Sequence, residues 1–216
     1  EHWDGDGGGS GNGGAVPDSV LGVFALNRRD DILDELDTPP IIMHIAQKEG
    51  RKYSYEHVFR SVQKHLVDSA ANDFTFLVDF FGTRSHDLFN IIYTKTLSLC
   101  LENLEYFLST TLDSVALLLL IRINQHLRKT MQRRCCPCLD PYLDRIDLLL
   151  WPRIKVVLDK NIASLTSSSP GKLGPLEFHV HFVAKRYAHF SMAVTVLHRS
   201  GSQFGGMTDA SFVNNV

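Results

Sequence analysis

The chain has 216 residues, of which 44% are hydrophobic and 21% are charged. This length and apolar content suffice to bury a sizeable core, which excludes a chain that is disordered throughout. The 22 Lys and Arg residues nearly balance the 24 Asp and Glu residues, so the net charge of -2 gives no general attraction to nucleic acid or to an anionic membrane.

The first part of the chain predicts a linker. Residues 1–19 are dominated by Gly, Ser, Asn and Asp, which cannot bury enough apolar surface to offset the entropy of ordering. We expect a flexible, Gly- and Asp-rich linker over residues 1–38, with a disordered amino-terminal end. The acidic residues of segment 21–37 are expected on a solvated helix face, because the ligand spacing of a calcium-binding EF-hand is absent. The start at Glu1, without a signal peptide, is expected for part of a longer protein.

Residues 39–200 are predicted to form one helical domain, because apolar residues recur at spacings of three and four. After an extended stretch at residues 41–45, a helix is expected to begin at Ser54 and to end at Gly82, a residue type that favours helix termination. Ser85 or Asp87 is predicted to cap the next helix.

The central region, from residue 85 to about residue 134, has one apolar stripe. Thr110 and Asp113 have the spacing of a capping box, so the region forms either one long helix or two helices in tandem. The most apolar block, residues 115–121, is far shorter than the roughly 20 residues that a membrane span needs. The stripe consists of Tyr93, Leu97, Cys100, Leu104, Phe107, Leu108, Val115 and Leu118.

Prolines divide the remaining residues. Pro137 and Pro141 predict a loop, and Pro152 predicts the first turn of a new helix, where its missing donor costs nothing. Residues 166–175 predict a connection rich in Ser, Pro and Gly, before a last helix at residues 178–199.

The predicted fold class is all-α, since strands are nearly absent from this pattern. Antiparallel helices are expected to pack as an elongated bundle or rod. Residues 201–216 contain neighbouring glycines and asparagines and are predicted to form an irregular tail.

No convergent set of catalytic or metal-binding groups is expected. The cysteines of segment 135–138 lack the second ligand pair of a structural zinc site, so a reduced loop is favoured over a site completed by His126. His179 and His181 have the spacing of metal ligands on a strand, but a helix places them on different sides. Residues 85–87 contain the residue types of a Ser-His-Asp triad, but a triad brings distant residues together. The chain is therefore predicted to have no catalytic site, no metal and no cofactor.

Two further groups have simple structural interpretations. Cys100 lies on the apolar stripe and is interpreted as a small core residue, not as a nucleophile. The basic residues of segment 128–134 lie where cations complement the dipole at a helix end, so a solvated helix end is favoured over a contact with anionic lipid or an acidic partner.

Four aromatic residues are candidates for partner contact or for the core, namely Phe107, Trp151, Tyr187 and Phe190. Apolar side chains on a helix face that the rest of the chain does not cover are expected to contribute to the affinity for a partner. For each residue by itself, the interior is the favoured position.

Six pieces of sequence, in this order, carry a resemblance to a known family. The chain resembles the middle portion of the vacuolar protein sorting-associated protein 52 family, the Sac2-like subunit of the Golgi-associated retrograde protein (GARP) complex, over about residues 40–199. The pieces are Tyr55-Glu56-His57-Val58-Phe59-Arg60-Ser61, His86-Asp87-Leu88-Phe89, Thr96-Leu97-Ser98-Leu99, the block 115–121, Leu149-Leu150-Trp151-Pro152-Arg153 and Arg186-Tyr187-Ala188-His189-Phe190.

The resemblance implies a helical rod of the complexes-associated-with-tethering type and a non-catalytic role in vesicle tethering. It implies three sister vacuolar protein sorting subunits as partners, with contacts to small GTPases and SNARE proteins and peripheral association with membranes. The expected location is the cytosolic face of the trans-Golgi network and endosomes, in retrograde transport between them. The family's amino-terminal coiled coil is missing from this sequence, so we expect a partial polypeptide. The alternatives are a small metal- or His-dependent hydrolase and an unrelated helical adaptor.

Overall fold

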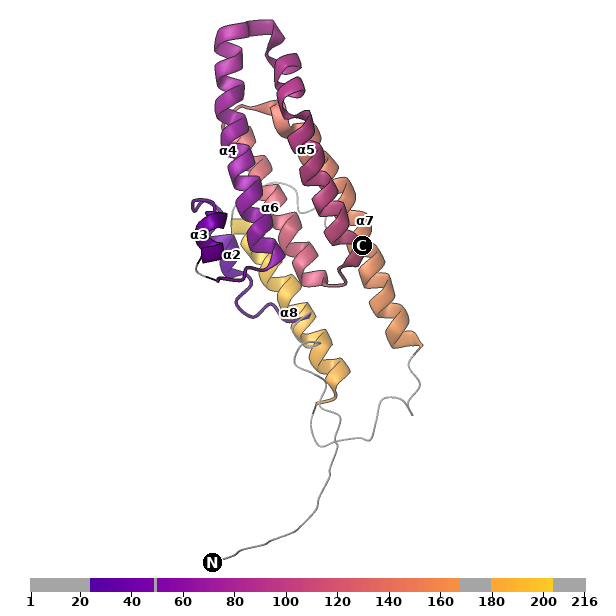
Figure 1. Cartoon of the computed structure of the whole chain (residues 1–216). Helices are drawn as coiled ribbons and strands as arrows, with labels where there is room; N and C mark the ends of the chain where they lie inside the picture. Colours follow the sequence, from indigo (N-terminus) through magenta and orange to yellow (C-terminus); the bar gives the residue numbers. More distant parts are fainter. Residues whose placement is uncertain (1–23, 49, 168–179, 204–216) are drawn as a thin grey trace, which may run out of the picture.

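The computed structural model describes residues 24–48, 50–167 and 180–203, and all regular elements in these ranges are helical. The long helices lie side by side in an elongated bundle, and successive ones run in opposite directions (Figure 1). This arrangement confirms the predicted all-α rod. The elements are α2 (Asp31–Asp34), α3 (Met43–Lys48), α4 (Tyr55–Phe81), η1 (Gly82–Arg84), α5 (Ser85–Thr110), α6 (Ser114–Arg133), η2 (Pro137–Leu139), α7 (Asp140–Thr166) and α8 (Phe182–Gln203).

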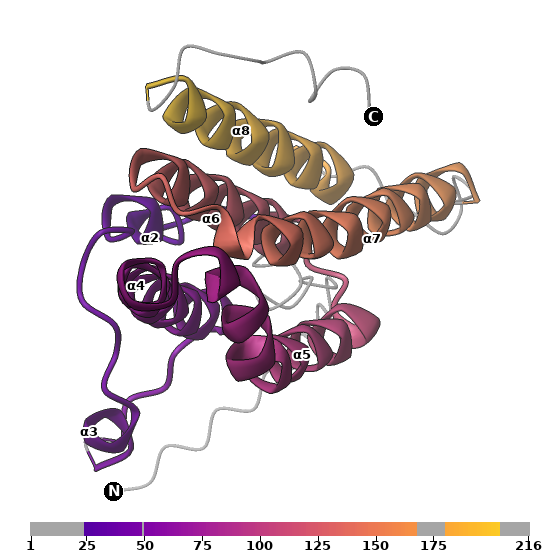
Figure 2. The same ribbon diagram turned by 90° about the horizontal axis from the view of Figure 1, so that it is seen from above.

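Helix α6 forms the centre of the bundle. Every residue of the apolar block 115–121 is buried, and a helix that is apolar on all sides has to be surrounded by other elements. It packs against α4, α7 and α8, which lie around it in the view from above (Figure 2). The buried Asn124 of α6 donates hydrogen bonds from Nδ2 to the carbonyl oxygen of Leu143 at 3.1 Å and to Oδ1 of Asp147 at 2.6 Å. These bonds tie α6 to α7.

The central region consists of two helices, α5 and α6, which decides between the two alternatives that the sequence leaves open. Asp113 caps α6, because its Oδ1 accepts a hydrogen bond of 2.9 Å from the backbone N–H of Ala116. Thr110 is the last residue of α5, and its hydroxyl donates to the carbonyl of Phe107. The break was predicted at the right place, but the capping role of Thr110 was wrong.

Helix α4 and helix α5 form a long hairpin. Ser54 precedes α4 and Gly82 follows it with φ of +57°, a conformation that suits glycine, so both predicted ends are confirmed. The predicted cap of α5 was wrong. The residue before α5 is Arg84, which makes no side-chain cap bond, because the short helix η1 runs directly into α5. Ser85 is buried in the first turn instead.

Helix α7 runs unbroken through Pro152, so the predicted new helix at this residue was wrong. Pro141 occupies the first turn of α7, where a missing donor costs nothing. Pro152 lies in the helix interior, where it cannot bond to the carbonyl of Leu148. Both Pro152 and Leu148 are exposed, so water can reach the freed carbonyl. The buried side chains of Leu150 and Ile154 hold the helix against the core on the other side.

The segment before α4 is more ordered than predicted. Residues 43–45 belong to α3 and are not extended. The linker expected to reach residue 38 ends earlier, because Leu26, Ile32 and Leu36 are buried and α2 packs against α6. The acidic residues Asp31 and Asp34 are exposed, as predicted for a solvated helix face. Residues 1–23 lie outside the described residues.

Helix α8 closes the bundle on the side of α6. Its Ala193 and Leu197 are buried in the core. The helix begins at Phe182 and extends to Gln203, so residues 201–203 are helical and not part of a tail. The predicted connection at residues 168–175, the predicted start at Phe178 and the rest of the tail lie outside the described residues.

Candidate functional site

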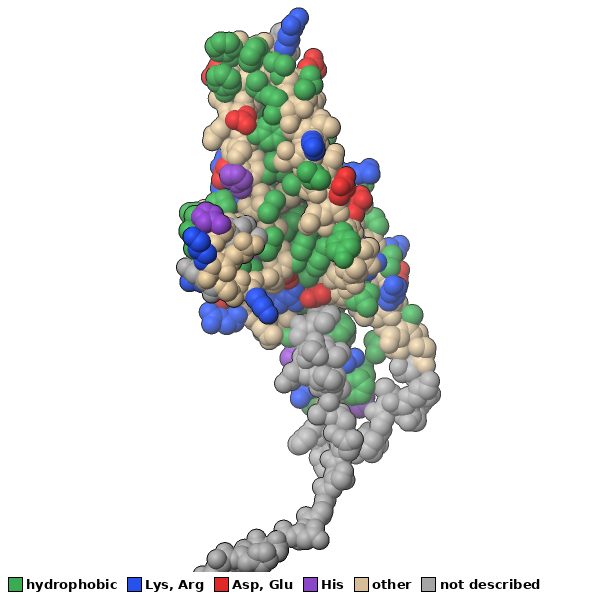
Figure 3. All heavy atoms as spheres, viewed as in Figure 1, with side chains coloured by type: hydrophobic (Ala, Val, Ile, Leu, Met, Phe, Trp, Pro, Cys, Tyr) green, Lys and Arg blue, Asp and Glu red, His purple; other side chains and the backbone are tan. Residues whose placement is uncertain are grey.

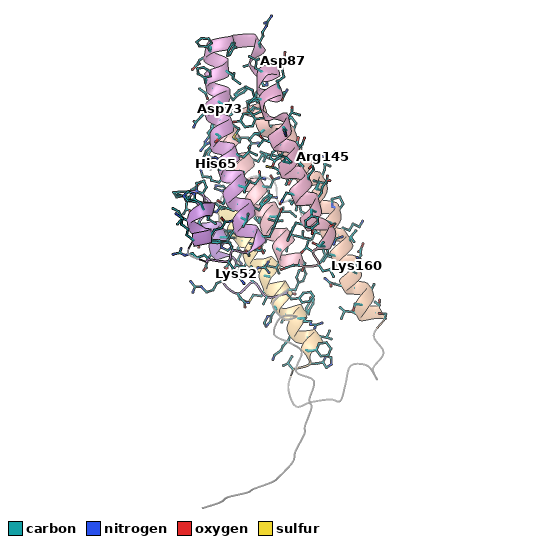
Figure 4. All side chains as sticks on the ribbon, in the orientation of Figure 1. Lys52, His65, Asp73, Asp87, Arg145 and Lys160 are labelled. Atoms are coloured by element: carbon teal, nitrogen blue, oxygen red, sulfur yellow. The ribbon has the colours of Figure 1, made fainter. Side chains whose placement is uncertain are left out.

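The described residues do not converge on a metal site. Among them, no three His, Cys, Asp or Glu side chains are grouped so that they could hold an ion. Figure 4 shows the same dispersion, since the labelled residues Lys52, His65, Asp87, Arg145 and Lys160 are spread along the bundle and do not face one another.

None of the four cysteines, all of which lie in the described residues, forms a disulfide. Cys136 and Cys138 are buried and Cys135 is exposed, and all are free. Burial and the neighbouring Cys136 raise the pKa of Cys138 to about 12. Burial also raises the pKa of Cys100. Because the thiolate is the nucleophile, such groups are unreactive near neutral pH.

The histidines considered above as catalytic or metal-binding candidates take part in packing and in local hydrogen bonds. His86 lies edge-on to Phe74, with ring centroids 4.9 Å apart, and does not form a triad with its neighbours in the chain. Nε2 of His126 lies 3.1 Å from Oδ1 of Asp37, and Nδ1 of His181 accepts from the N–H of Val183. His179 lies outside the described residues.

Several cations of the basic run 128–134 are bound within the chain. Arg128 contacts Asp144 at 2.6 Å and Asp147 at 2.9 Å, and Arg134 contacts Asp68 at 2.8 Å. These ion pairs join the end of α6 to α7 and α4. A contact with anionic lipid would have to compete with them.

Arg29 joins three parts of the chain. It contacts Oε1 of Glu56 in α4, and its Nη1 lies 2.9 Å from Oδ2 of Asp113, the cap of α6. Burial by itself raises the pKa of Glu56, but hydrogen bonds with Ser54 and Arg29 outweigh burial, so that the pKa is lowered. Burial dominates for Asp113 and raises its pKa, although Ala116 and Arg29 favour the ionised form. The cluster is a structural clamp at one end of the bundle.

The four aromatic candidates come from α5, α7 and α8 and differ in burial. Phe107, Trp151 and Phe190 are half-buried and pack against the core. Tyr187 is 73% exposed, although it lies only three residues from Phe190. The first three side chains therefore contribute to the core, whereas Tyr187 is mostly exposed.

An exposed apolar surface lies at the end of the bundle where α4 meets α5. We call Phe76, Phe80 and Phe81 the hairpin tip. Their exposed fractions are 60%, 73% and 45%, and the ring of Phe80 lies 5.6 Å from that of Phe76 and 5.2 Å from that of Phe81. Figure 3 shows apolar side chains gathered at this end. Clustered exposed aromatic rings are typical of interaction sites.

A second apolar surface runs along α5. We call Ile92, Leu99 and Tyr106 the α5 stripe, and these side chains are 58%, 55% and 75% exposed. The buried stripe of α5 was predicted from the sequence, whereas this exposed one was not. The signal was present, because the three residues recur at intervals of seven, which places them on one line of a helix.

No helix within the described residues is both long enough and apolar enough to cross a membrane.

Comparisons with known proteins agree on one family. The family model described as "Vps52, C-terminal" matches residues 18–211. The sequence motifs predicted the middle portion of such a protein, whereas this model is named for the C-terminal part. Vacuolar protein sorting-associated protein 52 A of Arabidopsis thaliana is 41% identical over 169 residues, which are 78% of this chain and 24% of the relative.

More distant relatives carry the same name. The Homo sapiens homolog is 33% identical over 183 residues, or 82% of this chain and 25% of the relative, and the Caenorhabditis elegans homolog is 27% identical over 201 residues, or 89% and 29%. The chain thus spans about a quarter of the length of these two relatives from Arabidopsis thaliana and Homo sapiens. No solved structure gives a significant match. The match over nearly the whole chain and the shared name of its relatives show that the chain belongs to the Vps52 family.

Proposed function

We propose that the chain is a non-catalytic part of a subunit of the GARP vesicle-tethering complex, acting in retrograde transport from endosomes to the trans-Golgi network. The observation that carries the proposal is membership of the Vps52 family over residues 18–211. The proposed partners are three sister vacuolar protein sorting subunits. The proposed place of action is the cytosolic face of the trans-Golgi network and of endosomes.

The architecture supports a tethering role. A helix rises about 1.5 Å per residue, so a 27-residue helix such as α4 or α7 spans about 40 Å. Such a rod supplies reach and lateral surfaces, which a tether needs. An unrelated helical adaptor is disfavoured by the family membership, and a hydrolase finds no supporting observation.

The hairpin tip is the proposed contact for a protein partner such as a small GTPase or a SNARE protein. Its exposed Phe76 and Phe80 can enter an apolar groove. Within residues 76–87, the exposed acidic residues are Asp79 and Asp87 and the exposed basic residue is Arg84. This excess of negative charge favours a partner groove with a basic rim over an anionic membrane. Peripheral membrane association would then be mediated by the partner protein.

Affinity capture tests the assignment. This chain and a full-length member of the family are expressed separately with the same tag, and recovery of the three sister subunits is scored. Recovery by both supports assembly through the residues of this chain, and recovery by the full-length protein alone restricts assembly to the rest of that protein. If neither form recovers the sister subunits, the tethering assignment fails.

A double variant of the hairpin tip, Phe76→Asp with Phe80→Asp, tests the surface. We expect at least a tenfold loss of any GTPase or SNARE protein captured with the wild type. Met192→Asp on α8, where Met192 is 66% exposed, is the matched control and should leave capture unchanged. Equal losses in both variants would remove the tip from the proposal.

A further inference from the structure

The α5 stripe is an apolar line that the described part of the chain leaves uncovered. Leu99 lies at its centre, with Ile92 seven residues before it and Tyr106 seven residues after it, and each side chain is more than half exposed. The line is about 21 Å long at 1.5 Å per residue. Helix α5 lies at the outside of the bundle, on the side away from α8 (Figure 2), so another helix can approach it.

One flank of the stripe carries two charges of opposite sign. Lys95 precedes Leu99 by four residues and Glu102 follows it by three. Each residue turns the helix by 100°, so both side chains are rotated around the helix axis by 40–60° from Leu99, in the same direction. Both are exposed, and neither forms an ion pair with another described residue. Seven residues, or about 10 Å along the helix, separate them, so they do not pair with each other.

We propose that a second copy of the chain covers the α5 stripe, with the two α5 helices antiparallel about a two-fold axis at Leu99. In this arrangement, the same flank of the two α5 helices comes together. A residue that lies a given number of positions before Leu99 in one copy meets the residue that lies about the same number of positions after Leu99 in the other copy. Ile92 then packs on Tyr106 of the second copy, and Leu99 packs on its own equivalent. Lys95 comes beside Glu102 of the second copy, and the symmetry repeats this ion pair.

The charges identify the occupant. In a two-fold symmetric interface, the same surface of both copies has to be complementary to itself. Lys95 and Glu102 meet this condition, because they have opposite charges and lie at nearly equal distances along the helix on either side of Leu99. The opposite flank is consistent, since Thr96 there meets Asn103 of the second copy as a polar pair. An anionic membrane would gain from Lys95 but would be repelled by Glu102. An interface of this length belongs to the small class, below about 1,200 Å², so the dimer is expected to be weak and in exchange with monomer.

Sedimentation velocity of the purified 216-residue chain, over a range of concentrations, tests the proposal. The wild type is expected to shift from the 24.3-kDa monomer toward twice that mass as concentration rises. Leu99→Asp buries two like charges at the axis and should weaken association at least tenfold. Met192→Asp, the same kind of change on α8, should leave association unchanged.

Charge reversal separates a second copy from any other occupant. Lys95→Glu alone and Glu102→Lys alone place like charges together and should each weaken association several-fold. The double variant Lys95→Glu with Glu102→Lys restores opposite charges in both pairs and should recover wild-type association. All of these residues are exposed, so circular dichroism should show an unchanged helical fold.

The outcomes are distinct from those of the capture experiment, because the purified chain is tested without other subunits. A monomer at every concentration overturns the proposal and leaves the stripe to a foreign protein. A dimer that is insensitive to Leu99→Asp, or a double reversal no better than the single ones, also overturns it.

Discussion

The ring of Tyr55 lies flat on the ring of Phe107, with centroids 3.7 Å apart and planes 4° apart. Tyr55 is the first residue of α4, and Phe107 lies in the last turn of α5. The stack therefore closes the open end of the α4–α5 hairpin, opposite the tip at Gly82. Burial raises the pKa of Tyr55 to about 12, so its hydroxyl remains neutral and can donate to Asn103.

Phe107→Ala is expected to lower the free energy of unfolding by about 2 kcal/mol, less than the 3–5 kcal/mol typical of a fully buried ring, because Phe107 is only half-buried. Urea denaturation measures the change. Tyr187→Ala is the matched control. As Tyr187 is mostly exposed, its loss should change stability by less than about 0.5 kcal/mol. Equal effects of the two variants would contradict the core role of Phe107.

Trp151→Ala should lower stability without affecting assembly. The side chain packs against the core from α7, and a loss of about 2 kcal/mol corresponds to a decrease in Tm of about 4–8 °C for a chain of this size. Thermal unfolding followed by circular dichroism gives Tm, and affinity capture gives assembly. An unchanged Tm with lost capture would instead make Trp151 a contact residue.

Glu56→Gln should remove part of the pH dependence of stability. The pKa of Glu56 is lowered in the folded chain, so its carboxylate stabilises the fold fully above the ordinary value of 4.5, and this contribution is lost as pH falls through the folded pKa. The stability advantage of the wild type over the variant should thus be largest near neutral pH and should shrink in acid. Chemical denaturation at a series of pH values measures it.

The exposed Glu105, which has no ion pair with a described residue, provides the control for Glu56. Glu105→Gln should leave stability nearly unchanged at each pH. A wild-type advantage over Glu56→Gln that grows on acidification would show that the bond between Arg29 and Glu56 does not stabilise the fold.

Pro152→Ala should stabilise the chain by about 1–2 kcal/mol. Alanine restores the donor for the carbonyl of Leu148 and removes the ring from the helix interior, and the greater entropy of the unfolded chain offsets part of this gain. Pro141→Ala, in the first turn of α7, should give no such gain. Urea denaturation compares the two, and a destabilised Pro152→Ala would indicate that the proline ring itself packs.

The ends of α4 were predictable because the helical spacing of apolar residues starts just after Ser54, and because Gly82 stops the helix locally through its positive φ. The path of α7 through Pro152 was not predictable. The local preference of proline for a helix start is overridden by Leu150 and Ile154, whose burial depends on α6 and the rest of the fold. Likewise, the burial of Leu26 and Ile32 depends on contacts distant in sequence, which composition does not reveal.

The candidate surfaces were less predictable than the helices. Tyr187 and Phe190 are three residues apart and satisfy the same helical spacing, yet only Phe190 packs against the core. The spacing identifies a face but not the position of its edge, which is set by neighbouring helices. In the α5 stripe, the regular spacing of seven residues marks apolar side chains that are exposed, on a side of the helix away from its buried face.

The enclosure of α6 has a consequence during protein synthesis. Of the helices that surround it, α4 precedes it in the chain, whereas α7 and α8 follow it. The apolar block 115–121 is therefore synthesised after α4 but before α7 and α8, so that part of its cover is still missing when the block is made. Until α8 has emerged, part of this block is exposed to solvent, and such transiently exposed apolar surface makes the nascent chain more prone to aggregation than the folded bundle.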